Sequence, residues 1–234
     1  MKKILITLFI LSFAIAPVKS QKITIKIIET TDLHGHLFPY DFIRDKNTGN
    51  SLAQVCAYVR QERMNKDQEV ILVDNGDVLQ GQPVVYYYNY EKTGNWHIVS
   101  QMMNYMKYDA ATVGNHDIET GHDVYDKLVK EFNFPWMAAN AVNDTTGEPY
   151  FEPYTIIEKQ GVKVAFFGLI TPGIPEWLPQ NIWRDMHFTD MVKTAEEWVP
   201  FIREKEQPDL LVGLFHSGVN YQYGGFDENS PCNP

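Results

Sequence analysis

Short apolar segments typical of strands alternate along this chain with longer segments of helical periodicity. In residues 22–29 isoleucines alternate with polar residues, which predicts a strand, and residues 51–66 have helical spacing after a serine start. Further strands are expected at 69–73, 110–113, 136–139, 154–158, 162–170 and 210–215, and further helices at 96–108, 121–132 and 190–205, the last capped by Thr189. This alternation predicts an α/β layered fold, and it constrains the chain more than any other feature.

Composition indicates a globular chain that is held together mainly by a packed core. The 234 residues suffice for one large domain or two small ones, and 44% hydrophobic with 21% charged residues excludes a disordered or fibrous protein. The net charge of −10 disfavours non-specific binding to nucleic acid, because an acidic surface repels phosphate backbones. Two cysteines are too few for a disulfide framework or a thiolate zinc site.

Residues 1–20 have the pattern of a signal peptide. Two lysines follow Met1, an apolar run covers residues 4–16, and the small residues Val18 and Ser20 precede an expected cleavage after Ser20. About 13 apolar residues are too few for a membrane span, which needs roughly 20. We therefore expect a secreted or periplasmic chain without a stable membrane span. Export would permit a disulfide between Cys56 and Cys232, although Cys56 lies on the apolar face of a predicted helix and suits a buried thiol equally well.

Metal-ligand types of side chain occur where the predicted strands end. Asp32 and His34 follow the first strand, Asp77 the second, Asn115 and His116 the third, and His216 a later one. In an α/β sheet the loops beyond the carboxyl ends of the strands meet at one edge, where ligands bind. In extended chain, Asp32 and His34 would point to the same side and hold one ion together. We expect the glycines before Asp77 and Asn115 to permit sharp turns.

The sequence around these residues resembles the secreted 5′-nucleotidase family of calcineurin-like metallophosphoesterases, which includes 2′,3′-cyclic-nucleotide phosphodiesterases and UDP-sugar hydrolases. Residues 25–37, Ile-Lys-Ile-Ile-Glu-Thr-Thr-Asp-Leu-His-Gly-His-Leu, are similar to its first signature, and Val-Gly-Asn-His-Asp at 113–117 to its second. Residues 213–218, Gly-Leu-Phe-His-Ser-Gly, fit as well. The resemblance covers residues 21–234 and implies a four-layer αββα sandwich with two divalent metal ions, here incomplete at its C-terminal end.

The resemblance also implies a role for each residue. Asp32 and His34 would bind the first ion, Asp77 would bridge both, and Asn115 and His216 would hold the second. The ions, Zn, Mn, Fe or Co, would make a shared water nucleophilic toward phosphorus. The expected substrate is a small nucleotide or another phosphoester. The non-ligand His116 would contact the phosphoryl group or protonate the leaving group.

The sequence departs from the family pattern in two places. The family orients its catalytic histidine with an aspartate, and the equivalent position here is Glu119, with Asp117 as the alternative. The family's Gly-His-x-His motif and its C-terminal nucleotide-binding domain do not occur before Pro234, which indicates a fragment of a longer protein. Two alternatives therefore stay open: a truncated metal-binding relative with weak or no activity, and a hydrolase of UDP-sugars or other phosphoesters.

One aromatic run allows two interpretations. Tyr-Tyr-Tyr-Asn-Tyr at 86–90 would either provide a stacking surface for a base or pack partly buried in a loop or helix, and packing is the more common outcome for such a run.

Overall fold

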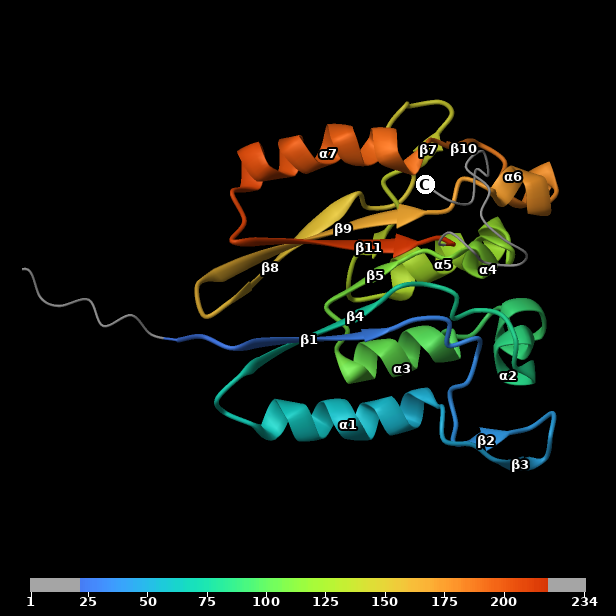
Figure 1. Cartoon of the computed structure of the whole chain (residues 1–234). Helices are drawn as coiled ribbons and strands as arrows, with labels where there is room; N and C mark the ends of the chain where they lie inside the picture. The colour runs from blue at the N-terminus through green and yellow to red at the C-terminus, as the bar shows by residue number, and fades with distance from the viewer. Residues whose placement is uncertain (1–21, 219–234) are drawn as a thin grey trace, which may run out of the picture.

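Two β-sheets lie between layers of helices in the computed structural model, which describes residues 22–218 (Figure 1). The expected signal peptide and Cys232 lie outside the described residues. The first sheet has the order β1-β4-β5-β6, and all its strand pairs are parallel. Its strands are β1 (Ile25–Thr30), β4 (Glu69–Asp74), β5 (Ala110–Thr112) and β6 (Trp136–Met137).

The second sheet has the order β11-β9-β8. The strands β8 (Tyr154–Lys159) and β9 (Val162–Ile170) form an antiparallel hairpin, and β11 (Leu210–His216) pairs with β9 in parallel. Gln160 and Gly161 connect the hairpin with φ angles of 50° and 81°. All the strands of the two sheets except β8 point toward the end of the molecule that carries the short helices α2 (Pro83–Tyr86), α4 (Asn115–Ile118) and α6 (Ile174–Trp177) (Figure 1).

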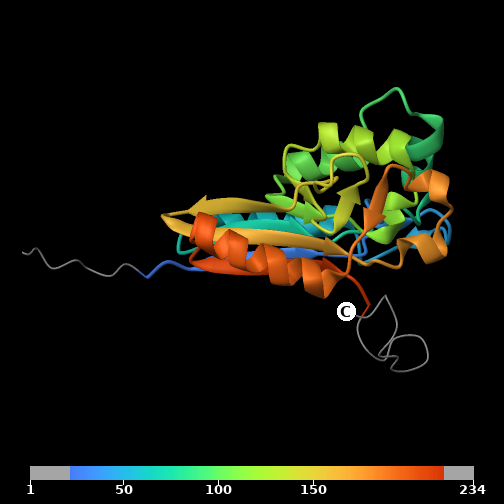
Figure 2. The same ribbon diagram turned by 90° about the horizontal axis from the view of Figure 1, so that it is seen from above.

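Helices cover the outer faces of both sheets. The first sheet is covered by α1 (Leu52–Met64), α3 (Ile98–Met106) and α5 (His122–Glu131), while α7 (Met191–Glu206) covers the second. Figure 2 shows α7 from above, running along the strands. The shorter elements are β2 (Tyr40–Asp41), β3 (Lys46–Asn47), β7 (Ala141–Asn143), β10 (Met186–Phe188), the π-helix η1 (Tyr87–Glu91) and the 3₁₀ helix η2 (Gln180–Ile182).

Three clusters of buried apolar residues fill the spaces between the layers. One includes Leu72 of β4 and Met103 of α3, a second joins Val73 to Phe166 between the sheets, and a third packs Phe167 against α7. The two sheets approach closely at Gly168, where a Cβ atom would lie 2.5 Å from that of Met137. Helix, sheet, sheet and helix thus follow one another, which confirms the predicted α/β layers.

The structure corrects the expected cap of α7. The N-cap of α7 is Asp190 and not Thr189, because the Asp190 side chain accepts the Lys193 amide while the Thr189 hydroxyl bonds Thr194.

Cys56 is half-buried against the core. Within residues 22–218, none of the helices combines the length and the apolar character that a membrane crossing requires.

Candidate metal centre

The carboxyl ends of β1, β4, β5 and β11 bring the expected ligand loops together. The loop after β1 is bonded to the loop after β4 through main-chain groups: Asp32 N–H donates to Gly76 O at 3.0 Å and His34 N–H to Asp77 O at 2.9 Å. His216 is the last residue of β11. Four segments that are distant in sequence therefore meet at one point, as parallel strand topology predicts.

Asp32, Asp77 and His216 form the centre of this site. Each offers a ligand atom, and these atoms lie within 4.8 Å of one another. His216 Nε2 lies 3.2 Å from Asp77 Oδ2 and 3.1 Å from Asn115 Oδ1. His216 Nδ1 donates to the Asn75 carbonyl at 2.6 Å, which directs Nε2 toward the oxygen atoms of the site.

Charge and burial favour a cation at this point. Asp77 and His216 are 3% and 7% exposed. Burial opposes protonation of His216, but hydrogen bonding and attraction from Asp77, with the Asn75 carbonyl, prevail and raise the pKa of His216 to about 9. Burial also opposes ionisation of Asp77, yet the interaction with His216 holds the pKa of Asp77 below its ordinary value. The surroundings of these side chains therefore stabilise positive charge.

His34 stands beside this cluster. Its Nε2 atom lies 3.6 Å from Asp32 Oδ1, and its Nδ1 atom is buried with no hydrogen-bond partner among residues 22–218. Buried ring nitrogens without partners are rare, and a metal ion is one group that satisfies them. The mixed carboxylate, amide and imidazole donors therefore fit one or two divalent transition-metal ions.

The backbone at the ligands is not extended, so the expected geometry of the Asp-x-His segment is wrong. Asp32, His34 and Asp77 have φ angles of 51°, 45° and 61°, in the left-handed region that non-glycine residues seldom adopt. The side chains of Asp32 and His34 still approach each other, but through this turn and not through alternation along a strand. Strained residues of this kind concentrate at functional sites.

The glycines before Asp77 and Asn115 serve different purposes. Gly76 has a φ of +94°, so it makes the expected turn. Gly114 has a φ of −101° and needs no left-handed turn. A Cβ atom on Gly114 would lie 2.2 Å from Asp77 Oδ1, so Gly114 permits the close approach of the two loops.

His116 lies next to the cluster and contacts Glu119. The His116 ring packs edge-on against His34 at 5.4 Å between centroids. The His116 Nδ1 atom is 2.5 Å from Glu119 Oε2, and both side chains are partly exposed. Between the two candidates for orienting His116, the structure therefore places Glu119 in contact with the ring.

Asp117 has a different environment from the one expected of a group that orients His116. Its side chain is fully buried, and its two oxygens accept four amide N–H groups, from Asp77, Val78, Leu79 and Gly114. Burial and the nearby Asp77 charge raise the pKa of Asp117 to about 6. Asp117 thus fixes the loops that carry the other residues, and the expectation that it orients His116 is corrected.

Two residues of the site were missed in the sequence. Asn75 supplies the carbonyl that orients His216, and its amide donates to Phe215 O at 3.2 Å. Asp74 is buried under the site, where burial raises its pKa to about 8 and Thr30 donates to it at 2.6 Å. The sequence does show an Asp-Asn pair directly after a predicted buried strand. A hydrogen bond to a main-chain carbonyl, however, cannot be predicted from residue types.

The other histidines have partners away from the centre. His36 contacts Gln82, His97 bonds Asn89, and His187 lies 2.6 Å from Asp144 Oδ1. His122 contacts Asp126 and Tyr150. Each of these four side chains therefore has a partner outside the Asp32, Asp77 and His216 group.

Comparison with known proteins finds relatives along most of this chain. A family model described as calcineurin-like phosphoesterase matches residues 25–233. A 2′,3′-cyclic-nucleotide 2′-phosphodiesterase/3′-nucleotidase of Haemophilus influenzae is 34% identical over an alignment of 233 positions, which covers 93% of this chain and 35% of that protein. A 5′-nucleotidase of Vibrio cholerae is 30% identical over 91% of this chain and 36% of its own length.

Solved structures give the same result. The crystal structure of the calcineurin-like phosphoesterase YfkN from Bacillus subtilis matches with a TM-score of 0.74 at 33% identity, over 86% of this chain and 64% of that one. This chain spans about a third of the two curated relatives above. The layered sheets, the polar groups at the strand ends and these similarities lead to one conclusion: the chain belongs to the calcineurin-like phosphoesterase family.

Proposed function

We propose that this chain is the catalytic part of a metal-dependent phosphoesterase that hydrolyses nucleotides, of the 5′-nucleotidase or 2′,3′-cyclic-nucleotide phosphodiesterase type. The convergence of Asp32, Asp77 and His216 within 4.8 Å carries the proposal, because this donor set suits a divalent cation at a strand-end site. The names of the Haemophilus and Vibrio relatives supply the substrate class.

In this proposal five residues hold two ions. Asp32 and His34 would bind the first, Asn115 and His216 would bind the second, and Asp77 would contribute to both. Such ions acidify a bound water and neutralise the charge of a phosphoryl group. The protein orients the ligands, since Asn75 fixes the His216 ring and Asp117 fixes the Asp77 main chain.

His116 acts on the phosphoryl group. The contact with Glu119 fixes the ring and places a proton on Nδ1, so that Nε2 is available to the substrate. When both ring nitrogens carry protons, the Nε2–H group would donate a hydrogen bond to a phosphoryl oxygen or pass its proton to the leaving oxygen, and His116 would then be neutral with its remaining proton on Nδ1 beside Glu119. Glu119 is a positioning residue in this scheme, because it acts through His116.

The proposal extends to the organisation of the whole protein. Residues 1–20 direct export and are removed, and residues 21–234 contribute to the phosphoesterase domain. The longer relatives support a nucleotide-binding domain after this one in the complete protein. The protein then works outside the cytoplasm on small nucleotides.

The test is hydrolysis of 5′-AMP and 2′,3′-cyclic AMP by the purified chain after chelation and after return of Zn²⁺ or Mn²⁺. Activity should depend on the added ion, and Asp77→Asn should lower kcat/KM by about 1,000-fold, since metal stabilisation of a transition state amounts to several kcal/mol. The matched control is Asp67→Asn on the exposed surface, which should keep full activity. Equal turnover by the Asp77 variant would refute the bridging role.

A second candidate function is metal binding with weak or no turnover. It is favoured by the single three-residue ligand group, Asp32, Asp77 and His216, found within residues 22–218. Metal content of the purified chain separates the two candidates. Two tightly held ions together with hydrolysis support the phosphoesterase, whereas one ion per chain without hydrolysis supports the second candidate.

A further inference from the structure

A groove of about 470 Å³ lies between helices α1 and α3, which cover the outer face of the first sheet. Ala53 and Cys56 line it from α1, while Ile98, Met102 and Met106 line it from α3. Apart from one glutamine and two tyrosines, every lining residue is apolar. Concave apolar surfaces of this size are typical of sites that bind small molecules.

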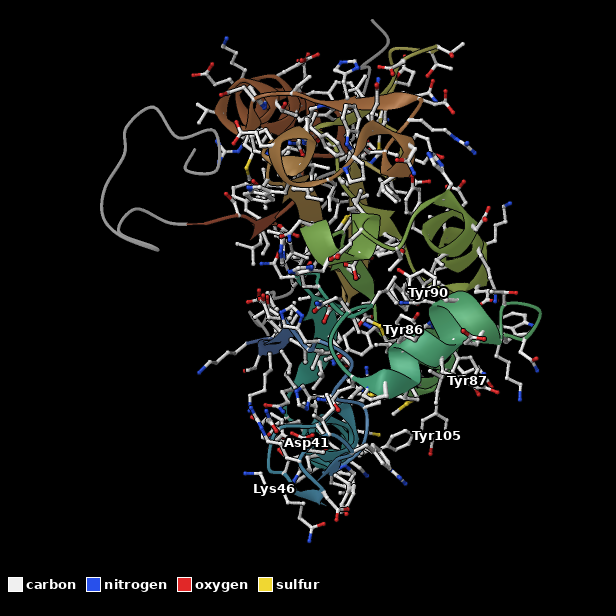
Figure 3. All side chains as sticks on the ribbon, turned by 90° about the vertical axis from the view of Figure 1, so that its right-hand side faces the viewer. Asp41, Lys46, Tyr86, Tyr87, Tyr90 and Tyr105 are labelled. Carbon is white, nitrogen blue, oxygen red and sulfur yellow. The ribbon has the colours of Figure 1, made fainter. Side chains whose placement is uncertain are left out.

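The side chains of the groove belong only partly to the core. Cys56, Ile98 and Met102 pack against the core cluster but stay half-buried. Tyr105, which also lines the groove, is 71% exposed and lies on the same side of the molecule as Tyr87 (Figure 3). The groove therefore presents apolar surface to solvent, and contiguous surface of this kind marks binding sites in folded proteins.

The run of tyrosines in the sequence contributes one residue to the groove. Tyr88 lines it and packs against His97, with 5.7 Å between the ring centroids. Tyr86, Tyr87 and Tyr90 are 59%, 48% and 46% exposed (Figure 3). The interpretation of the run as packing is therefore confirmed for Tyr88.

Two methionines give the groove an adaptable wall. The side chains of Met102 and Met106 are unbranched and flexible, and their sulfur atoms are polarisable, so that they adjust to the shape of a bound group. Met106 is buried, whereas Met102 is half-buried. Such a wall suits a flexible alkyl chain better than a rigid polar ligand, which needs fixed hydrogen-bonding partners.

Arg60 lies at one end of the groove. It follows Cys56 by four residues and Ala53 by seven, so the three share one face of α1. Arg63 of the same helix donates to the carbonyl of Lys107 at 2.8 Å, so this part of α1 meets the C-terminal end of α3. Arg60 is exposed, and within residues 22–218 its guanidinium makes no hydrogen bond or ion pair. An apolar groove with a cation at its end is complementary to an apolar chain with an anionic head group.

We propose that this groove binds an anionic amphiphile, a single alkyl chain that ends in a carboxylate. The chain lies along Met102 and Met106, and the carboxylate accepts hydrogen bonds from the Arg60 guanidinium, whose planar fork matches it. Helix α1 rises about 10 Å from Ala53 to Arg60, so one such molecule reaches both parts of the site. None of the lining residues is a proposed metal ligand, so the inference is independent of phosphoester hydrolysis.

Cys56 reports whether the groove is occupied, because its half-buried thiol is one of the lining groups. The experiment alkylates the reduced chain with iodoacetamide and quantifies the modified Cys56 peptide by mass spectrometry, which separates it from Cys232. Dodecanoate at about ten times its Kd, below its micelle concentration, should slow the modification about 10-fold, since only the unoccupied chain reacts. Dodecyltrimethylammonium has the same chain with a positive head group and should slow it less than about 3-fold at that concentration.

Calorimetric titration with dodecanoate and dodecanol separates the head group from the chain. Arg60→Gln should weaken the binding of dodecanoate about 5-fold, as expected for the loss of an exposed ion pair, and leave that of dodecanol unchanged. Ala53→Trp fills the groove and should abolish the binding of both, with the melting temperature as the check of folding. Lys130→Gln, at an exposed lysine of α5, is the matched control and should bind both as the unmodified chain does.

Two results would overturn the proposal. One is unslowed alkylation of Cys56 in the presence of dodecanoate, and the other is equal binding of dodecanoate by Arg60→Gln and the unmodified chain. Vesicles of anionic phospholipid provide the comparison with a membrane surface. If these vesicles capture the chain while dodecanoate leaves Cys56 unprotected, this face contacts a membrane and the groove is not a site for a single-chain carboxylate.

Discussion

The Asp117 carboxylate accepts the backbone N–H of Asp77 at 2.9 Å, across 40 positions of sequence. The same Oδ2 atom accepts the Gly114 N–H at 2.9 Å. One buried side chain therefore connects the loop after β4 with the loop after β5. The separation of Asp77 from Asn115 and His116 depends on this connection, so Asp117 links fold stability to the geometry of the candidate metal centre.

Substitution Asp117→Asn should destabilise the fold. The amide nitrogen would face main-chain N–H donors, and hydrogen bonds to a charged acceptor would be lost. We expect the free energy of unfolding to fall by about 2 to 4 kcal/mol, measured by urea denaturation at neutral pH. The control Asp67→Asn, an exposed aspartate, should change it by less than about 0.5 kcal/mol. Equal midpoints and slopes for both variants would contradict the account of Asp117.

Glu119 should affect the rate more than substrate binding. Removing the carboxylate with Glu119→Ala frees the His116 ring, and kcat should fall about 10- to 100-fold with a smaller change in KM. Glu119→Gln keeps an acceptor for the Nδ1 proton and should recover part of the loss. Steady-state kinetics with 5′-AMP provides both values. A rise in KM with an unchanged kcat would show that Glu119 binds substrate and does not position His116.

His97 should make stability depend on pH. Its ring is fully buried, its Nδ1 atom accepts the Val99 N–H at 3.2 Å, and its Nε2 atom donates to Asn89. Burial, with a smaller contribution from Lys127, lowers the pKa of His97 to about 4. The unfolded chain takes up the proton near pH 6.5, so stability should fall as the pH decreases from 6.5 to 4, by about 3 kcal/mol.

Urea denaturation of His97→Asn checks this dependence. Asparagine keeps a cap acceptor for the Val99 amide but has no ring to protonate. The difference in unfolding free energy between the two chains should shrink as the pH falls through this window. The exposed His187→Asn serves as the comparison and should follow the unmodified chain at every pH. If the difference in unfolding free energy between the His97 variant and the unmodified chain did not change with pH, His97 would not be a neutral ring in the folded chain.

The start of α7 offers a test of helix capping. Asp190→Ala removes the acceptor of the Lys193 amide, 2.9 Å away, and should cost about 1 kcal/mol of stability in thermal or urea unfolding. Thr189→Ala removes a hydroxyl that contacts Thr194 and should cost less than about half of that. A larger loss of stability in Thr189→Ala than in Asp190→Ala would show that Thr189 caps the helix.

Most of the fold could be predicted from the spacing of apolar residues, because strands and helices must bury one face in the core. The strand and helix patterns predicted β4, β9, α1 and α7 to within a few residues, and their alternation predicted the layers. The strand-end positions of Asp32, Asp77 and His216 followed from parallel topology. The cap of α7 did not follow from the sequence, since Thr189 and Asp190 are both suitable residue types and only the backbone path decides between them.

The rest of the site depends on contacts that no local pattern contains. The left-handed backbone at Asp32 and His34 is imposed by main-chain bonds to the loop after β4. The choice between Glu119 and Asp117 depends on which carboxylate is buried against amides, and the π-helix that exposes Tyr86 and Tyr90 is fixed by Asn89. The loop after β1 and the burial of Asp117 thus depend on residues roughly 40 positions away in the chain, and the π-helix depends on Leu79, which lies outside the tyrosine run.

Calorimetric titration of the chelated chain with Zn²⁺ or Mn²⁺ tests the central claim most directly. The unmodified chain and Asp67→Asn should bind the ion saturably, and Asp77→Asn should weaken binding by at least about 100-fold. Binding should also raise the melting temperature, because the folded state alone presents the three donors together. If the unmodified chain takes up no ion, or if Asp77→Asn binds it equally well, the strand ends do not form a metal centre.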